Sequence, residues 1–362
     1  MRSHNCVSAT FFYYQRVERA SFVMRIVSLG EIMLRLEPHG YARFLQASEF
    51  GAVYGGSEAN VCVSLSHFCH ETVFVTKLPK NALGNAAIND LRKYGVNTEF
   101  VARGGERLGI YFLETGASQR SSKVIYDRKN SSFSTSCIND YNLDEIFKNA
   151  KWFHFSGITP ALSPDSAELC LSMIKHAKKI GITVSFDVNY RANLWSYEQA
   201  AAVLPMYMPY IDILFCGYRE AKEIFNITVD DKYIENGYII RDGYRDLCDK
   251  MVSTLGVKAI ATTLRDSISA SDNELSGMLF CDNKLLFAKN YSIRIVDRVG
   301  GGDAFAAGLI NGFLDENMSK EEALEFAVAA SVLKHTIEGD FNMVSANEVA
   351  DLAMGGNSSV KR

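Results

Sequence analysis

Short apolar segments alternate with amphipathic segments along this chain, and that order constrains the fold more than any other feature. The apolar runs span four or five residues each and are typical of buried strands, at 26–29, 73–77, 152–156, 183–187, 211–215 and 259–263. Segments with helical periodicity lie between them, at 58–68, 86–94, 164–180 and 197–208. Strands that alternate with helices in this way form parallel sheets. The sequence therefore predicts an α/β fold, with a mostly parallel central sheet and helices on both faces.

Two regions, at about 31–54 and 107–128, break this order. Within the second region, residues 109–114 and 123–128 alternate polar and apolar side chains. Alternation of this kind indicates half-exposed antiparallel strands. We expect the two regions to form a small antiparallel β lid over the mouth of the main domain, which suits a reaction that must exclude water.

The composition predicts one packed domain, which we place at residues 24–355, followed by a tail at 356–362. Of the 362 residues, 48% are hydrophobic and 22% are charged, which is typical of a folded core and not of disorder. Residues 1–23 lack the apolar core and cleavage site of a signal peptide. We interpret them as an extension outside the fold, and a partner-binding or targeting arm is the alternative. Residues 228–246 are polar and irregular, as in a surface insertion.

Net charge and cysteine content indicate which classes of partner and which cellular compartment to expect. A net charge of −4 without a basic block disfavours a nucleic-acid partner. No apolar run is long enough to cross a bilayer, so we expect no membrane association. The eight cysteines are scattered without a Cys-x-x-Cys pair, and the histidines form no cluster with them. We therefore expect reduced thiols in a cytoplasmic protein, without a zinc site.

The segment at 297–308, DRVGGGDAFAAG, carries the strongest chemical signal. Gly300, Gly301 and Gly302 precede a helix expected at about 303–314. A glycine turn that leads into a helix offers free backbone N–H groups and the positive end of the helix dipole, which suits phosphate. Asp303 lies at the mouth of this anion site, where an ionised carboxylate can take a proton from a hydroxyl. Alternatively, Asp303 merely caps the helix.

This segment resembles the second signature of the ribokinase-like sugar kinases, the phosphofructokinase B group. The signature has an Asp, two residues, Gly-x-Gly-Asp, then a Phe and a Gly, and every position is present. The first signature of these kinases resembles residues 55–60, GGSEAN. The resemblance implies a ribokinase-like fold, ATP and Mg²⁺ as cofactors, and Asp303 as the general base. It also implies that the amides of residues 300–303 stabilise the transferring phosphoryl group, and that Gly55, Gly56 and Asn60 contact the substrate.

A finer resemblance covers residues 24 to about 352 and is to the 2-keto-3-deoxygluconate kinase subgroup of this family. The matching strings lie at 30–36, 107–114, 117–120, 126–128, 154–160, 187–195 and 334–342. The resemblance implies transfer of the γ-phosphate of ATP to a hydroxyl of 2-keto-3-deoxygluconate, giving 2-keto-3-deoxy-6-phosphogluconate.

A substrate of this kind carries a carboxylate, which an arginine fork or tyrosine hydroxyls bind well. The candidates are Arg128 and Arg191, with Tyr111 and Tyr126 on the lid. Tyr126 and Arg128 are two residues apart and therefore share one face of a strand. The alternatives are ordinary lid packing for Tyr126 and a surface ion pair for Arg128. Asp340 would bind sugar hydroxyls, unless it is only a turn residue.

The nucleotide and metal positions follow from the same resemblance. It implies that Asn189 and Arg191 reach the nucleotide phosphates, that Thr263 and Arg265 lie in the nucleotide loop, and that Gly300 and Gly302 contact the phosphates. Glu220 fits the acidic position tied to Mg²⁺, although Gly217 stands where the family has Asn. Glu220 as a simple charge at a helix N-terminus is the alternative.

Three other functions were considered. Two remain as alternatives: a kinase for another sugar, similar to a fructokinase, and a catalytically silent sugar sensor on the same fold. A dinucleotide-binding oxidoreductase is disfavoured, because no Gly-x-Gly-x-x-Gly follows the first strand. We also expect a homo-oligomer, a dimer or higher, formed through the exposed lid edges.

Overall fold

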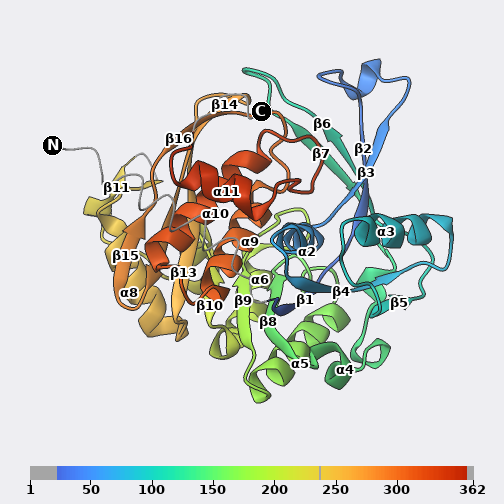
Figure 1. Cartoon of the computed structure of the whole chain (residues 1–362), viewed down its shortest axis with the longest axis horizontal. Coiled ribbons are helices and arrows are strands. Elements are labelled where there is room, and N and C mark those ends of the chain that lie inside the picture. The colour runs from blue at the N-terminus through green and yellow to red at the C-terminus, as the bar shows by residue number, and fades with distance from the viewer. Residues whose placement is uncertain (1–22, 236–237, 357–362) are drawn as a thin grey trace.

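The computed structural model describes residues 23–235 and 238–356, and these form one large sheet with helices on both faces and a smaller sheet beside it (Figure 1). The large sheet has the strand order β15-β14-β13-β10-β9-β8-β1-β4-β5, and β16 also pairs with β14. Its strands are β1 (Arg25–Leu29), β4 (Glu71–Leu78), β5 (Val101–Arg103), β8 (Ala150–Ser156), β9 (Thr183–Asp187), β10 (Ile213–Phe215), β13 (Ala259–Ser267), β14 (Asp272–Cys281), β15 (Lys284–Phe287) and β16 (Tyr291–Arg294).

The pairings from β13 through β5 are parallel, and those of β14 with β13, β15 and β16 are antiparallel. The predicted mostly parallel α/β fold is confirmed, and each of the six predicted strands lies in this sheet. The antiparallel edge after β13 was not predicted.

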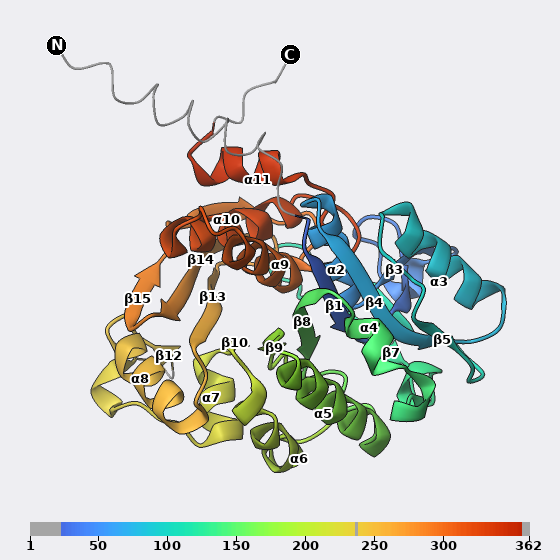
Figure 2. The ribbon, with the colours of Figure 1, turned by 60° about the horizontal axis from the view of Figure 1, so that its bottom comes forward.

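Two layers of helices cover the large sheet (Figure 2). One layer contains α2 (Ser57–His67), α3 (Ala82–Lys93), α9 (Gly301–Leu314) and α10 (Lys320–Lys334), and α11 (Ala346–Ala353) packs on the outer side of α10. The other contains α4 (Leu143–Phe147), α5 (Pro164–Lys179), α6 (Tyr197–Val203), α7 (Tyr218–Phe225) and α8 (Gly243–Leu255). The strands are apolar on both sides because each side packs on a helix layer: in β1, Val27 joins the core under α5, and Ile26 joins the core under α9 and α10.

The smaller sheet is the predicted lid, with the order β3-β2-β6-β7. It consists of β2 (Met33–Glu37), β3 (Gly51–Gly55), β6 (Ile110–Glu114) and β7 (Lys123–Asp127). The pairs β2–β3 and β6–β7 are antiparallel, as predicted, but β2 and β6 pair in parallel. The parallel pair arises because the first strands of two hairpins lie next to each other.

The segment predicted as an irregular insertion contains a 3₁₀ turn at Asp231–Tyr233 and two short paired strands, β11 (Ile234–Glu235) and β12 (Tyr238–Ile239). Helix α8 then begins at Gly243, before the expected end of the insertion. The predicted extension at 1–23 and tail at 356–362 lie almost wholly outside the described residues. Within the described ranges, no helix has the length and apolarity to cross a membrane. The seven cysteines described are free, and five of them are buried.

Candidate active site

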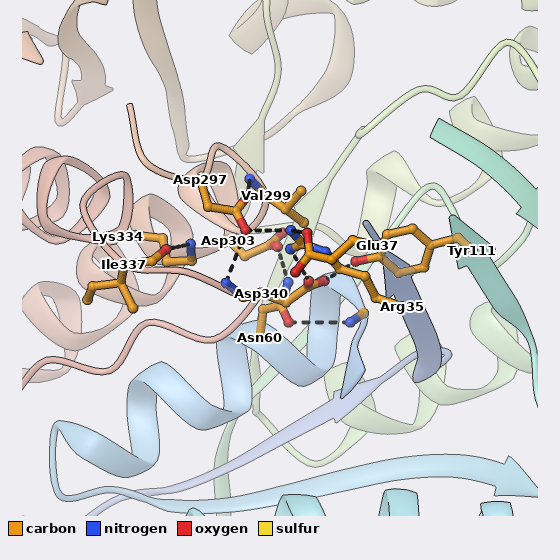
Figure 3. A network of polar contacts seen from close by, with 12 residues as sticks. Arg35, Glu37, Asn60, Tyr111, Asp297, Val299, Asp303, Lys334, Ile337 and Asp340 are labelled. Atoms are coloured by element: carbon orange, nitrogen blue, oxygen red, sulfur yellow. Dashed lines mark hydrogen bonds and ion pairs between the residues drawn. The ribbon is translucent and has the colours of Figure 1, made fainter. Parts of the chain in front are cut away.

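The site forms where the carboxyl ends of the parallel strands, the lid and the start of α9 meet (Figure 3). Ser57 and Asn60, in the first two turns of α2, hold the carboxylate of Asp303. The Oγ of Ser57 donates to Oδ1 at 2.7 Å, and Nδ2 of Asn60 donates to Oδ2 at 2.7 Å. Asn189, just after β9, donates from Nδ2 to Ser57 Oγ at 3.0 Å. Three distant segments therefore converge on one carboxylate.

Asp303 does not cap its helix. Helix α9 begins at Gly301, two residues earlier than predicted, and its N-cap is Gly300, so Asp303 is the third helical residue. Burial raises the pKa of Asp303, while the hydrogen bonds from Asn60 and Ser57 and the charge of Arg191 lower it. Asp303 was predicted to be ionised, and burial opposes that state. The carboxyl is consequently a stronger base than an exposed aspartate.

The three glycines of the turn serve different purposes. Gly300 has a φ of 83°, a left-handed conformation that favours glycine, and a Cβ there would lie 2.1 Å from the carbonyl O of Asp340. A Cβ on Gly301 would lie 2.3 Å from the ring of His335. A Cβ on Gly302 would meet nothing within 4 Å, and Gly302 is exposed. Packing therefore requires the first two glycines, and open space remains over the third.

A buried arginine on the lid strand β2 joins the lid to the loops around α9 and α10. Arg35 is 1% exposed. Its Nη1 donates to Oδ1 of Asp340 at 2.9 Å, its Nη2 donates to Oδ2 of Asp297 at 2.6 Å, and Nη2 also pairs with Glu37. The hydroxyl of Tyr111 donates to Oδ2 of Asp340 at 2.6 Å. Asp340 is thus part of an ion-pair network and not a simple turn residue.

Asp297, the first residue of the second signature, fixes the loop geometry. Its Oδ1 accepts from the backbone N of Val299 at 3.0 Å, and its Oδ2 accepts from the backbone N of Gly339 at 3.0 Å. No role was predicted for Asp297 or Arg35. The signal in the sequence is Arg35 inside an apolar strand, where a charge requires buried partners.

Arg128 is not a surface residue, and it already has a carboxylate partner. Its Nε donates to Oε2 of Glu31 at 2.9 Å, and its Nη2 pairs with the same oxygen. The two side chains are 7% and 3% exposed. The guanidinium carbon lies 5.6 Å from the ring centre of Tyr126, which in turn packs against Tyr111 with 5.9 Å between ring centres. The alternative of a surface ion pair for Arg128 is therefore wrong, because the pair is buried.

The glycines of the first signature permit close packing within the protein. A Cβ on Gly55 would lie 1.9 Å from Oδ2 of Asp340, and a Cβ on Gly56 would lie 2.0 Å from the carbonyl O of Glu31. Gly56 precedes α2 as its N-cap residue. Both glycines therefore let the turn before α2 approach the buried acids of the site.

The residues predicted for nucleotide and metal line the same end of the sheet. Arg191 donates to the carbonyl O of Tyr190 at 3.1 Å, and its charge lowers the pKa of Asp303 and of Asp187. Burial nevertheless raises the pKa of Asp187 to about 7, with contributions from Asp303 and Glu220. Asp303 and Glu220 therefore both repel Asp187, and a bound cation would relieve that repulsion.

Glu220 lies in the first turn of α7. A Cβ on Gly217 would lie 2.8 Å from Oε2 of Glu220, so the missing asparagine leaves room for that carboxylate. Among the described residues, no three His, Cys, Asp or Glu side chains form a metal cluster. Glu220 and Asp187 are the residues that would hold Mg²⁺ beside a nucleotide, because their carboxylate oxygens are ligands that this ion prefers.

Arg265 and Thr263 lie on β13. Nη2 of Arg265 lies 2.8 Å from Nε2 of His335, whose Nδ1 lies 2.6 Å from the carbonyl O of Ser331. Burial and the charge of Arg298 lower the pKa of Arg265 to about 10. Arg265 and Arg298 are neighbouring like charges, which would favour an anion between them. The nucleotide role of Arg265 stays a prediction.

The site also contains two buried ionisable residues for which no role was predicted. Glu58, in α2, accepts at Oε1 from the backbone N of Ser156 at 2.9 Å and from Oγ1 of Thr159 at 3.2 Å. Burial raises the pKa of Glu58 to about 7. The other charge is Lys334, the last residue of α10, which is fully buried.

Comparison with known proteins identifies the class. A family model described as pfkB family carbohydrate kinase matches residues 24–346, and the chain belongs to that family. It is therefore an enzyme, a phosphotransferase with an alcohol group as acceptor.

Particular relatives carry more specific names. The crystal structure of 2-dehydro-3-deoxygluconokinase from Thermotoga maritima is 44% identical, with a TM-score of 0.87, and the match covers 92% of this chain and 100% of that one. The 2-dehydro-3-deoxygalactonokinase of Haloferax volcanii is 27% identical over 338 residues, 93% of this chain and 99% of the relative. The 2-dehydro-3-deoxygluconokinase of Bacillus subtilis is 28% identical over 326 residues, 89% and 93% of the two chains.

Proposed function

We propose that the protein transfers the γ-phosphate of ATP to a hydroxyl of 2-keto-3-deoxygluconate, also called 2-dehydro-3-deoxygluconate, and forms 2-keto-3-deoxy-6-phosphogluconate. The observation that carries this proposal is the position of Asp303, which Ser57 and Asn60 hold at the open side of the Gly300–Gly302 turn. The relative with 44% identity bears the name of this activity.

In this proposal Asp303 removes the proton from the substrate hydroxyl as that oxygen attacks the γ-phosphorus. The bond from phosphorus to the bridging oxygen breaks, and ADP leaves. The backbone N–H groups of residues 300–303, at the positive end of α9, stabilise the charge on the transferring group. Mg²⁺, when bound with the nucleotide beside Glu220 and Asp187, neutralises phosphate charge.

The substrate carboxylate has fewer free partners than the sequence suggested. Arg128 and Asp340 are engaged with Glu31 and Arg35. Arg191 faces the acidic site from the loop after β9, and we assign it the main electrostatic role toward the substrate and the phosphates. Tyr111 and Tyr126, whose rings pack against each other on the lid, would enclose the sugar. Asn189, Thr263 and Arg265 stay assigned to the nucleotide.

We further propose a cytoplasmic homodimer formed through the lid. The free thiols among the described residues fit a reducing compartment. The lid and its loops expose apolar side chains at Leu45 (97%), Ile125 (53%) and Phe50 (40%). Exposed apolar groups of this kind favour burial against a partner, and a second copy supplies a matching surface.

The proposed substrate is tested by ADP release with a panel of acceptors at one ATP concentration. The panel contains 2-keto-3-deoxygluconate, 2-keto-3-deoxygalactonate, fructose and ribose. The proposal predicts the highest kcat/KM for 2-keto-3-deoxygluconate. A higher value for the galactonate would assign the activity that the Haloferax relative is named for, and a higher value for a neutral sugar would make the enzyme a general sugar kinase. Binding without turnover of any acceptor would indicate a sensor.

A further inference from the structure

Lys334 is a buried cation that the proposed reaction does not yet use. Its side chain is 0% exposed, and Nζ donates to the carbonyl O of Ile337 at 3.0 Å (Figure 3). A Cβ on Gly300 would lie 3.2 Å from Cε of Lys334, so the lysine stem packs directly against the glycine turn. Burying an ammonium group is unfavourable unless nearby charges compensate it.

Carboxylates supply that compensation. Burial lowers the pKa of Lys334, and the charges of Asp297, Asp340 and Asp303 raise it, while Arg35 acts in the opposite direction. The ammonium group therefore lies among two acids of the second signature, Asp297 and Asp303, and Asp340 of the loop after α10, with one like charge nearby.

Lys334 also lies where two loops join. The backbone N of Val296 donates to the carbonyl O of His335 at 2.8 Å, and the backbone N of Gly339 donates to Oδ2 of Asp297 at 3.0 Å. The first loop leads into the glycine turn, and the second carries Asp340. A charge at this junction acts on both loops at once.

We propose that Lys334 is a positioning residue for phosphoryl transfer: it fixes the Gly300 turn against the 335–340 loop and places a positive charge next to that turn. The catalytic part of this inference rests on the proposed kinase function. A lysine that only filled space would be replaceable by an uncharged side chain of similar length.

The same charge acts on the general base. Burial raises the pKa of Asp303, the hydrogen bonds from Asn60 and Ser57 on α2 lower it, and the charges of Arg191 and Lys334 lower it further. Two acids face Asp303 from other elements and oppose them: Glu58 on α2 and Asp187 at the end of β9. Loss of the lysine charge therefore moves the ionisation of Asp303 to higher pH.

The test compares Lys334→Met with Lys334→Arg, using whichever acceptor of the panel the wild type turns over best. We expect kcat of Lys334→Met to fall about 100-fold, the size of effect seen when one electrostatic donor is removed from an active site. The acidic limb of its pH profile should move to higher pH, and ammonium chloride should restore part of kcat. Tetramethylammonium chloride, matched in ionic strength, is too large for the vacated space and should restore nothing. Lys334→Arg should keep more activity than Lys334→Met.

Three results would overturn the inference: kcat of Lys334→Met within about twofold of wild type, an unshifted pH profile, or equal rescue by both salts. If the methionine variant unfolds, Lys334→Gln takes its place, and binding of a non-hydrolysable ATP analogue with and without ammonium is measured by calorimetry. That binding readout requires no turnover, so it separates this inference from the proposed substrate, which the acceptor panel tests on wild-type enzyme.

Discussion

Replacing Arg35 by methionine should lower the free energy of unfolding by several kcal/mol at neutral pH. The guanidinium is 1% exposed and pairs with Asp340, Asp297 and Glu37, of which the first two are 3% and 7% exposed. Removing one partner of a buried ion pair typically costs about 3–5 kcal/mol, because the remaining charges stay buried without compensation. With an unfolding entropy of about 2.1 cal/mol/K per residue, that loss lowers Tm by about 4–7 °C for a chain of this size.

The stability of the Arg35→Met variant should depend on pH, and the direction follows from the pKa of Asp340. Burial raises the pKa of Asp340 above its ordinary value, and Arg35 opposes the rise. Without the arginine the folded-state pKa rises further, so the folded variant binds a proton that the unfolded chain does not. Its stability is therefore highest at low pH and is lost as pH rises through the raised pKa.

Thermal and urea unfolding between pH 4 and pH 8 test this reasoning, with Glu37→Gln as the matched control. Glu37 is 23% exposed, so its loss should cost less than about 1 kcal/mol. A cost for Arg35→Met below 1 kcal/mol at pH 7, or a cost that does not shrink toward pH 4, would refute the account of the network.

Other predictions concern the turn, a buried acid and the lid. Gly300→Ala should lower the free energy of unfolding, measured with urea, by about 2 kcal/mol or more, because the φ of 83° and the nearby backbone carbonyl exclude a Cβ. As a control, Gly302→Ala should have a Tm within a degree or two of wild type. Glu58→Gln should be more stable than wild type at pH 8, by up to about 3 kcal/mol, and equal to it near pH 4, because the pKa of about 7 makes ionisation of Glu58 unfavourable in the folded state. Leu45→Asp combined with Ile125→Asp should leave only a species near 40.3 kDa in sedimentation, whereas the wild type sediments as a dimer; a monomeric wild type would contradict the lid interface.

The sequence revealed the parts of the fold that local patterns encode. Apolar runs and helical periods located six strands of the large sheet, and the glycine run located the turn before α9. The edge strands β14 to β16 were not predicted because no helix lies between them, so the strand–helix alternation that located the other six strands does not extend to this edge. The start of α9 was placed two residues late, because glycine is a poor helix former and yet Gly301 and Gly302 join the first turn.

Partners that are far apart in the sequence limited what could be predicted of the site. Arg35 lies 262 residues from Asp297 and 305 residues from Asp340, so no spacing rule joins them. Arg128 was expected to be free for a carboxylate, and its pairing with Glu31, 97 residues away, depends on how the lid docks on β1. Long-range burial decides which charges are already paired, and that information is absent from local patterns.

The role of Asp303 as the general base of a 2-keto-3-deoxygluconate kinase is tested most directly by comparing wild type with Asp303→Asn. Phosphorylation of 2-keto-3-deoxygluconate is monitored by ADP release and by identification of the phosphorylated product. We expect wild type to form the 6-phosphate and kcat of the variant to fall at least about 100-fold, with the thermal melt and ATP binding preserved. A variant that retains kcat within a few-fold of wild type would contradict the role of Asp303 as the base, and with it the account of the site.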